Sequence, residues 1–165
     1  MFIDVDYETK PKILESVIKA IKEADLIILS MGSLYTSILP NLICEEVKNA
    51  IDESNAEVMY ICNIVTQPGE TDNFKASDHI KVLNKYLGKK KVSSVIVNNG
   101  TISKEVLETY STKEQKDIVI FDKENLEKIP VKILDDDLVI IENGTLRHNN
   151  LKLALKIYSY LISEN

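Results

Sequence analysis

The sequence predicts an α/β fold, a mostly parallel Rossmann-like sheet with helices on both faces. Short apolar runs alternate with amphipathic helical stretches along the chain, which is typical of parallel sheets. The runs are continuously apolar, as in strands buried on both faces. Three of them end in polar, turn-rich segments at residues 30–37, 63–72 and 98–103. Because the carboxyl ends of parallel strands meet at one edge, we expect the functional site at that edge.

The expected elements of the first third are justified by apolar runs and by spacings of three or four residues. They are a short strand at residues 2–5, a helix with Pro11 in its first turn and Leu14, Val17, Ile18 and Ile21 on one face, a strand at 26–29, and a helix after Pro40 with Ile43, Val47, Ala50 and Ile51 on one face.

The remaining two thirds repeat this alternation of strands and helices. The expected elements are a strand at 58–62, a helix marked by Ile80, Leu83 and Leu87, a strand at 92–97, a helix with Val106, Leu107 and Tyr110 capped by Ser103, strands at 118–121 and 138–141, and a closing helix with Leu151, Ala154, Leu155, Tyr158, Leu161 and Ile162.

Size and composition indicate one globular domain over residues 1–165, with 44% hydrophobic residues. The net charge of -6 disfavours a general nucleic-acid-binding role, because phosphate backbones need a basic patch. No apolar run reaches roughly 18 residues and no export signal is visible, so we expect no membrane insertion and a cytoplasmic protein. Cys44 and Cys62 lack metal-like spacing and are expected to be buried thiols.

The turn at residues 30–37 suits an anion, most simply a nucleotide phosphate. Gly32 lets the backbone approach a ligand, and Ser33, Thr36 and Ser37 offer hydroxyls next to amides that no helical hydrogen bond uses. The same hydroxyls could instead cap the start of a helix. Tyr35 could stack on a base or sugar, or it could pack in the core.

The loop that follows the strand at 58–62 carries more polar side chains than a Pro-Gly turn requires. Glu70 could hydrogen-bond a ribose or hold a metal ion. The candidate ligand-binding residues of this loop are Thr66, Gln67, Gly69, Glu70 and Thr71.

Four further polar residues near this edge have two interpretations each. Asn63 and Asn98 could read a pyrimidine or hold a sugar hydroxyl, and strand-end asparagines also form Asx turns. Asp78 is expected to be a partner of the helix dipole and His79 is expected at the surface, with a functional role for either residue as the alternative.

Three motifs in one order resemble the YvcK/CofD-like family. They are residues 24–42, residues 63–79 and the Leu146-Arg147-His148-Asn149 segment. The resemblance is closer to the YvcK-type gluconeogenesis factors and more distant to the 2-phospholactate transferases of deazaflavin coenzyme biosynthesis. The chain lacks the family's Gly-Gly-Gly-Thr-Gly loop and has Ser30-Met31-Gly32-Ser33 where the family has Gly-Pro-Gly-Ser. It resembles only the carboxyl-terminal half of a family member.

The resemblance implies a regulatory protein that binds a UDP-sugar and is linked to cell-wall synthesis, cell shape and gluconeogenic carbon metabolism. It implies that Tyr110 and Arg147 hold this ligand; core packing for Tyr110 and a pair with one of Asp135–Asp137 for Arg147 are the alternatives. No catalytic residue or protein metal site is expected, although magnesium is a possible cofactor. The alternative activity is a magnesium-dependent 2-phospholactate transferase. Expected protein contacts are a homodimer or the missing amino-terminal half.

Overall fold

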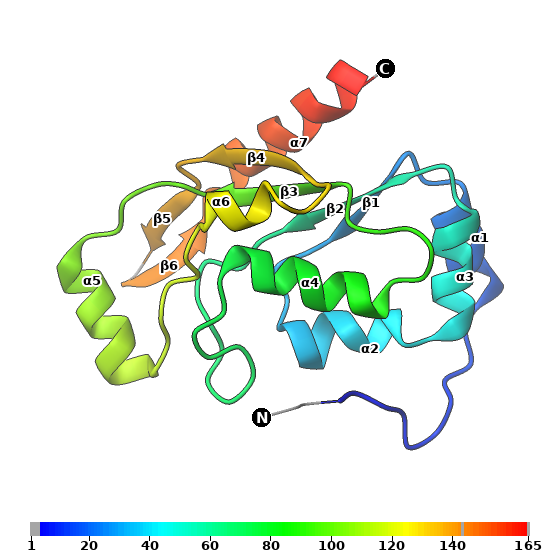
Figure 1. Cartoon of the computed structure of the whole chain (residues 1–165), viewed down its shortest axis with the longest axis horizontal. Helices are drawn as coiled ribbons and strands as arrows, with labels where there is room; N and C mark the ends of the chain where they lie inside the picture. The colour runs from blue at the N-terminus through cyan, green and yellow to red at the C-terminus, as the bar shows by residue number, and fades with distance from the viewer. Residues whose placement is uncertain (1–3, 143, 165) are drawn as a thin grey trace.

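The computed structural model describes residues 4–142 and 144–164 and confirms the α/β fold class (Figure 1). Its main sheet has four parallel strands in the order β1-β2-β3-β4, and each strand pairs with the next along the chain. The strands are β1 (Leu26–Leu29), β2 (Glu57–Ile61), β3 (Ser94–Asn98) and β4 (Lys132–Asp136). All carboxyl ends therefore lie at one edge of the sheet, as predicted.

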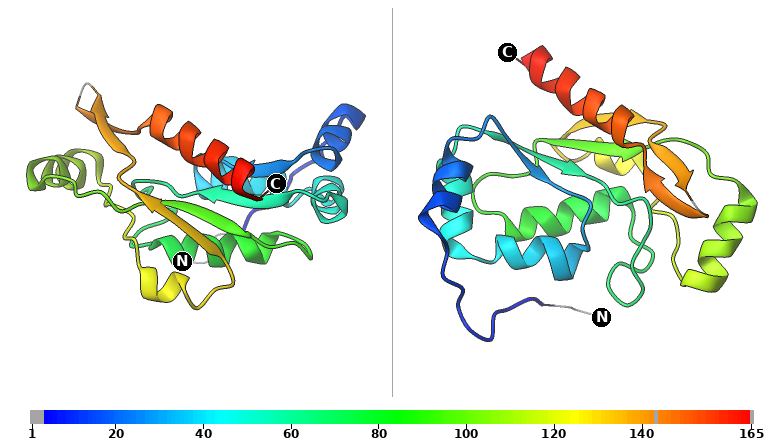
Figure 2. Two further views of the ribbon diagram at one scale, coloured as in Figure 1. Left: turned by 90° about the horizontal axis from the view of Figure 1, so that it is seen from above. Right: turned by 180° about the vertical axis from the view of Figure 1, so that it is seen from behind.

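Helices cover both faces of this sheet, but unequally (Figures 1 and 2). The helical segments are α1 (Glu15–Lys22), η1 (Leu34–Ile38, a π-helical turn), α2 (Leu39–Leu42), α3 (Glu45–Glu53), α4 (Ala76–Tyr86), α5 (Lys104–Thr109), η2 (Tyr110–Glu114), α6 (Lys123–Leu126) and α7 (Asn150–Glu164). The main core lies between the sheet and α2, α3, α4 and α6. On the opposite face α7 packs through Leu153, Ile157 and Tyr160 against Met59, Ile61 and Ile96.

Two predicted strands are placed differently by the structure. Residues 118–121 do not form a buried strand: they make only isolated bridges, Val65 with Ile118 and Lys75 with Ile120, and Ile120 is 57% exposed. Residues 138–141 do contribute a strand, β5 (Val139–Glu142), but it pairs antiparallel with β6 (Thr145–His148) in a separate sheet.

The actual fourth strand, β4, was missed by the sequence analysis. Only two apolar residues, Ile133 and Leu134, lie between its charged ends. β4 lies at an edge of the sheet, and its residues are exposed or only partly buried, so charged side chains are tolerated there. Apolar continuity therefore misses a strand whose apolar run is only two residues long.

One predicted helix start, one predicted helix cap and one predicted strand are corrected. Pro11 lies outside α1, which begins at Glu15 after an extended Leu14. Ser103 occupies the N-cap position of α5, but its side chain makes no capping hydrogen bond. The strand expected at 2–5 falls partly outside the described residues, and Asp4 and Val5 are not in a strand.

The remaining expectations about the interior hold. Cys44 and Cys62 are buried free thiols, and burial raises the pKa of Cys62 to about 12. Among the described residues, no helix is long and apolar enough to cross a membrane.

Candidate functional site

The turn after β1 and the loop after β2 are in direct contact at the carboxyl edge of the sheet. Ser33 Oγ donates to Glu70 Oε2 at 2.6 Å, and Asn63 Nδ2 donates to the carbonyl oxygen of Gly32 at 3.1 Å. The two segments lie far apart in sequence, and the parallel pairing of β1 with β2 places them side by side. Two of the three segments predicted to converge at this edge are therefore in direct contact.

A chain of hydrogen bonds joins these side chains into one group. Thr36 Oγ1 donates to Ser33 Oγ at 2.6 Å, and Gln67 Nε2 donates to Glu70 Oε1 at 2.9 Å. Ser33 also accepts from the backbone N–H of Thr36 at 3.4 Å, so it caps η1 while it contacts Glu70. We call Ser33, Thr36, Gln67 and Glu70 the edge cluster.

Gly32 is required by close packing of the turn. A Cβ added at Gly32 would lie 2.9 Å from Ser37 Cβ, closer than side chains pack. Gly69 instead supplies a left-handed conformation, with φ of +78°, in the loop that carries Glu70. Each glycine thus shapes one of the two segments that meet at the edge cluster.

The rim of the edge cluster offers both exposed hydroxyls and an aromatic ring. Thr36 and Ser37 are exposed, whereas Tyr35 is partly buried. Burial, with a smaller contribution from the charge of Glu70, raises the pKa of Tyr35. The Tyr35 side chain packs partly against the main core.

Two predicted binding residues of the loop are engaged inside it instead. Thr66 and Thr71 are each 2% exposed. Thr66 Oγ1 accepts from the backbone N–H of Asp117 at 2.9 Å, and Thr71 Oγ1 accepts from the backbone N–H of Gln67 at 2.8 Å. Both hydroxyls fix the shape of the loop rather than face its rim.

Tyr110 is placed in a small core. It is 7% exposed and packs with Ile64 and Leu146, and its hydroxyl accepts from the backbone N–H of Leu146 at 2.5 Å. Tyr110 also borders a hollow of about 300 Å³ that includes Glu108 and Lys116. The geometry favours the packing alternative, with ligand contact limited to the edge of the ring.

Arg147 is not brought into the edge cluster. Its neighbours Leu146 and His148 face the end of β2, where His148 Nε2 donates to the carbonyl oxygen of Cys62 at 3.1 Å. Since side chains alternate along a strand, Arg147 points to the other face of the β5–β6 hairpin. Within the described residues it makes no ion pair with Asp135–Asp137; Lys156 and Lys152 pair with Asp136 and Asp137 instead.

The structure also shows the roles of Asn98, Asp78 and His79. Asn98 shapes its own loop, since its Oδ1 accepts from the backbone N–H of Gly100 at 3.3 Å, and it joins this loop to the residue before β5 by accepting from the backbone N–H of Leu138 at 2.9 Å. Asp78 accepts from the backbone N–H of Lys75 and caps α4. His79 was expected at the surface, and this was wrong: it is 1% exposed, because it lies on the face of α4 that packs under the sheet.

Sequence reasoning missed Tyr60, a residue of β2 whose side chain contacts Asn63. Its hydroxyl donates to Asn63 Oδ1 at 2.8 Å, and the residue is fully buried. A tyrosine within the apolar run of 58–62 was the available signal, because a buried phenol needs a hydrogen-bond partner.

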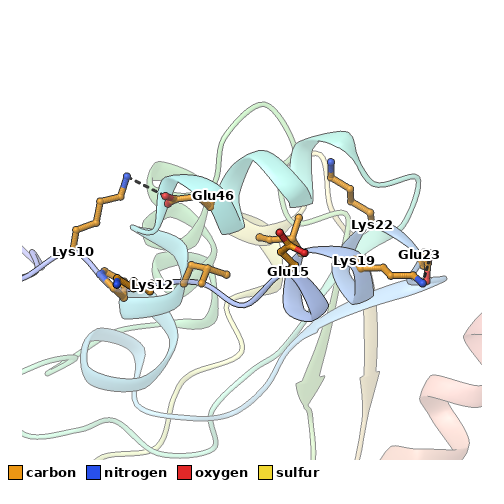
Figure 3. A pocket seen from close by; sticks show the side chains of 10 residues that line it. Lys10, Lys12, Glu15, Lys19, Lys22, Glu23 and Glu46 are labelled. Atoms are coloured by element: carbon orange, nitrogen blue, oxygen red, sulfur yellow. Dashed lines mark ion pairs between the residues drawn. The ribbon is translucent and has the colours of Figure 1, made fainter.

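A separate hollow of about 830 Å³ lies at the amino-terminal end of the sheet (Figure 3). Pro11, Ile13 and Ile18 give it an apolar floor. Four lysines and three glutamates line it, and ion pairs join Lys10 to Glu46 at 3.0 Å and Lys19 to Glu23 at 3.8 Å. Among the described residues, no strand end or candidate residue lines this hollow, so we place the site at the carboxyl edge.

Glu70 is the one charged metal ligand among the four members of the edge cluster. In the described part of the chain, no group of three or more histidine, cysteine, aspartate or glutamate residues is arranged to hold a metal ion.

The comparisons with known proteins agree on one family. The family model described as 2-phospho-L-lactate transferase CofD matches residues 4–139. The gluconeogenesis factor of Bacillus subtilis is 39% identical over 141 residues, covering 86% of this chain and 44% of that protein. The gluconeogenesis factor of Listeria innocua is 40% identical over 150 residues, covering 91% and 45%.

A crystal structure of a protein from Bacillus halodurans is similar to this chain with a TM-score of 0.84. It is 39% identical, and the match covers 92% of this chain and 48% of that one. The chain thus spans less than half the length of the relatives it matches.

Proposed function

Because the chain belongs to the CofD family and its relatives include gluconeogenesis factors, we propose that it binds a UDP-sugar at the edge cluster without turning it over. In this proposal the protein is a cytoplasmic regulator of cell-wall synthesis, cell shape and gluconeogenic carbon flow. The observation that carries the proposal is the contact between Ser33 and Glu70, which joins the two polar segments predicted to hold the ligand.

The chemistry of the edge cluster supports a ligand with several hydroxyl groups. The Glu70 carboxylate accepts hydrogen bonds and suits ribose or sugar hydroxyls, while Tyr35, two residues after Ser33, suits the face of a base. A diphosphate next to Glu70 needs a compensating cation. Glu70 would hold Mg²⁺ in that role, since hard cations bind oxygen ligands, and the ion would offset the charge of the phosphates.

The two histidines support binding rather than turnover. His79 is buried against Tyr60, and His148 donates to a backbone carbonyl. Burial lowers the pKa of both imidazoles, that of His79 to about 4. Neither ring is placed beside the Ser33 hydroxyl as a general base would be.

Calorimetric titration with UDP-N-acetylglucosamine, with and without Mg²⁺, tests the proposal. We expect saturable binding that Mg²⁺ strengthens, with the nucleotide recovered intact by chromatography. Glu70→Gln is expected to weaken binding about tenfold or more and to reduce the effect of Mg²⁺, because it removes the charge that holds the cation. Glu127→Gln, at an exposed position bordering α6, is the matched control. Absence of binding to this chain and to a full-length gluconeogenesis factor would reject the proposal.

The second candidate is a 2-phospholactate transferase, which the family model favours. Phosphoryl-type transfer depends on positioning and charge neutralisation, so it requires few protein nucleophiles. Incubation with nucleotide-activated 2-phospholactate, a deazaflavin acceptor and Mg²⁺ separates the two functions. Formation of the coupled coenzyme would replace the binding role with an enzymatic one.

An exposed apolar stripe on α7 favours an additional assembly role. Leu151, Leu155, Tyr158 and Ile162 are 72%, 56%, 63% and 58% exposed. Their spacing of four, three and four residues is that of a coiled-coil seam. We propose that α7 of a second copy covers this stripe, because an antiparallel pair lets each stripe shield the other.

Light scattering over a range of concentrations measures this association. We expect a dimer that Leu155→Lys converts to monomer with an unchanged circular dichroism spectrum. Ile141→Lys, at another exposed apolar position, is expected to leave the dimer intact. Monomer at all concentrations would eliminate self-association and leave the amino-terminal half of longer family members as the occupant.

A further inference from the structure

A buried row of polar side chains runs from α4 through β2 to the turn after β1. His79 Nδ1 lies 3.0 Å from the Tyr60 hydroxyl, which lies 2.8 Å from Asn63 Oδ1. Asn63 Nδ2 then reaches the carbonyl oxygens of Gly32 at 3.1 Å and of Met31 at 3.4 Å. His79 and Tyr60 are 1% and 0% exposed, so solvent does not compete for these bonds.

The direction of every hydrogen bond in this row follows from its last member. Carbonyl oxygens only accept, so the Asn63 amide must present its nitrogen to Gly32 and its oxygen to Tyr60. The single hydroxyl proton of Tyr60 is then donated to Asn63. The hydroxyl must therefore accept from His79, which requires the proton on Nδ1 and leaves Nε2 unprotonated.

The remaining atom of the row is consistent with this assignment. Among the described residues, His79 Nε2 is a buried side-chain atom without a hydrogen-bond partner. A buried N–H without a partner would cost more than an unused lone pair, so the unprotonated Nε2 is the less costly arrangement. The row thus begins at His79 and ends at the backbone of the turn.

We propose that His79 and Tyr60 are positioning residues for the ligand-binding turn. They hold the Asn63 amide in the one orientation in which its Nδ2 donates to the carbonyl oxygens of residues 31 and 32. Those carbonyls set the direction of the backbone that presents Ser33 and Thr36 to a ligand. The inference deepens the proposed function and rests on it for the binding experiment, but the tautomer and the turn can be tested without any ligand.

Proton–nitrogen correlation spectra of the histidine rings test the row in the free protein. We expect His79 to be neutral, with Nδ1 protonated and Nε2 unprotonated, throughout the neutral pH range. In Tyr60→Phe, the amide resonances of residues 31–36 are expected to shift, because Asn63 loses the bond that orients it. Tyr158→Phe, which removes an exposed hydroxyl on α7, should leave those amides unchanged. Protonated Nε2 would overturn the assignment.

Titration with UDP-N-acetylglucosamine tests the effect on binding. Tyr60→Phe and His79→Leu are expected to weaken binding about tenfold, whereas His79→Asn retains a donor near the position of Nδ1 and recovers most of the affinity. A merely structural role would lower the melting temperature of these variants without this ranking of affinities. If the wild type does not bind, the proposed function fails, while unshifted turn amides in Tyr60→Phe would reject the positioning role.

Discussion

Gly32→Ala is expected to reduce UDP-N-acetylglucosamine binding by at least about tenfold. The new methyl group would lie 2.9 Å from Ser37 Cβ, an atom held by the backbone of η1 and not the free end of a side chain. The turn must move away, and the carbonyl of residue 32 then moves relative to Asn63. Calorimetric titration measures the affinity, and a thermal melt measures how much stability is lost with it.

A double-mutant cycle with Ser37→Gly is the control for this steric explanation. Removing Ser37 Cβ removes the atom that the alanine meets, so Gly32→Ala should cost little affinity when introduced into Ser37→Gly. The comparison is made against Ser37→Gly itself, because Ser37 is a candidate ligand contact. Equal losses in both backgrounds would show that crowding at Ser37 is not the cause.

Leu83→Ala is expected to lower the free energy of unfolding by about 2–5 kcal/mol. Leu83 is 0% exposed and lies on the face of α4 that packs under β2 and β3 in the main core. Its loss removes apolar contacts and leaves a cavity that the two packed layers cannot fill. Urea unfolding followed by circular dichroism measures the change, with the slope of the transition checked for two-state behaviour.

Leu14→Ala is the matched control, because it deletes the same atoms from a leucine that is 69% exposed. Leu14 precedes α1, where leucine and alanine are equally poor capping residues, so we expect a change within about 0.5 kcal/mol. A cost at Leu83 no larger than at Leu14 would mean that the core under the sheet is not tightly packed.

The sequence was sufficient for strands β1, β2 and β3 and for the edge that carries the candidate site. The runs at 58–62 and 92–97 belong to the two central strands and are largely buried, whereas the run at 26–29 forms the edge strand β1, in which Ile28 is 41% exposed. Polar segments after those runs then had to meet at one edge. The contact of Ser33 with Glu70 is the outcome.

The same reasoning failed where neighbours in space decide the role of a residue. Ile118–Phe121 has the composition of a buried strand but bridges the loop after β2 to the start of α4, with Ile120 exposed. β4 has two apolar residues and still completes the sheet, because an edge strand is stabilised by its single neighbour. Composition does not distinguish these two cases.

The sequence by itself determined the alternation of strands and helices, the parallel sheet and the identity of the edge where polar groups gather. These features follow from local patterns, because runs of apolar residues indicate buried segments and glycines indicate turns. Only the tertiary structure decided that Thr66 and Thr71 serve their loop, that Arg147 faces away from the edge cluster, and that His79 is buried against Tyr60. A side chain's partner is set by which segments pack together, and hydrogen bonds between segments distant in sequence leave no periodic signal along the chain.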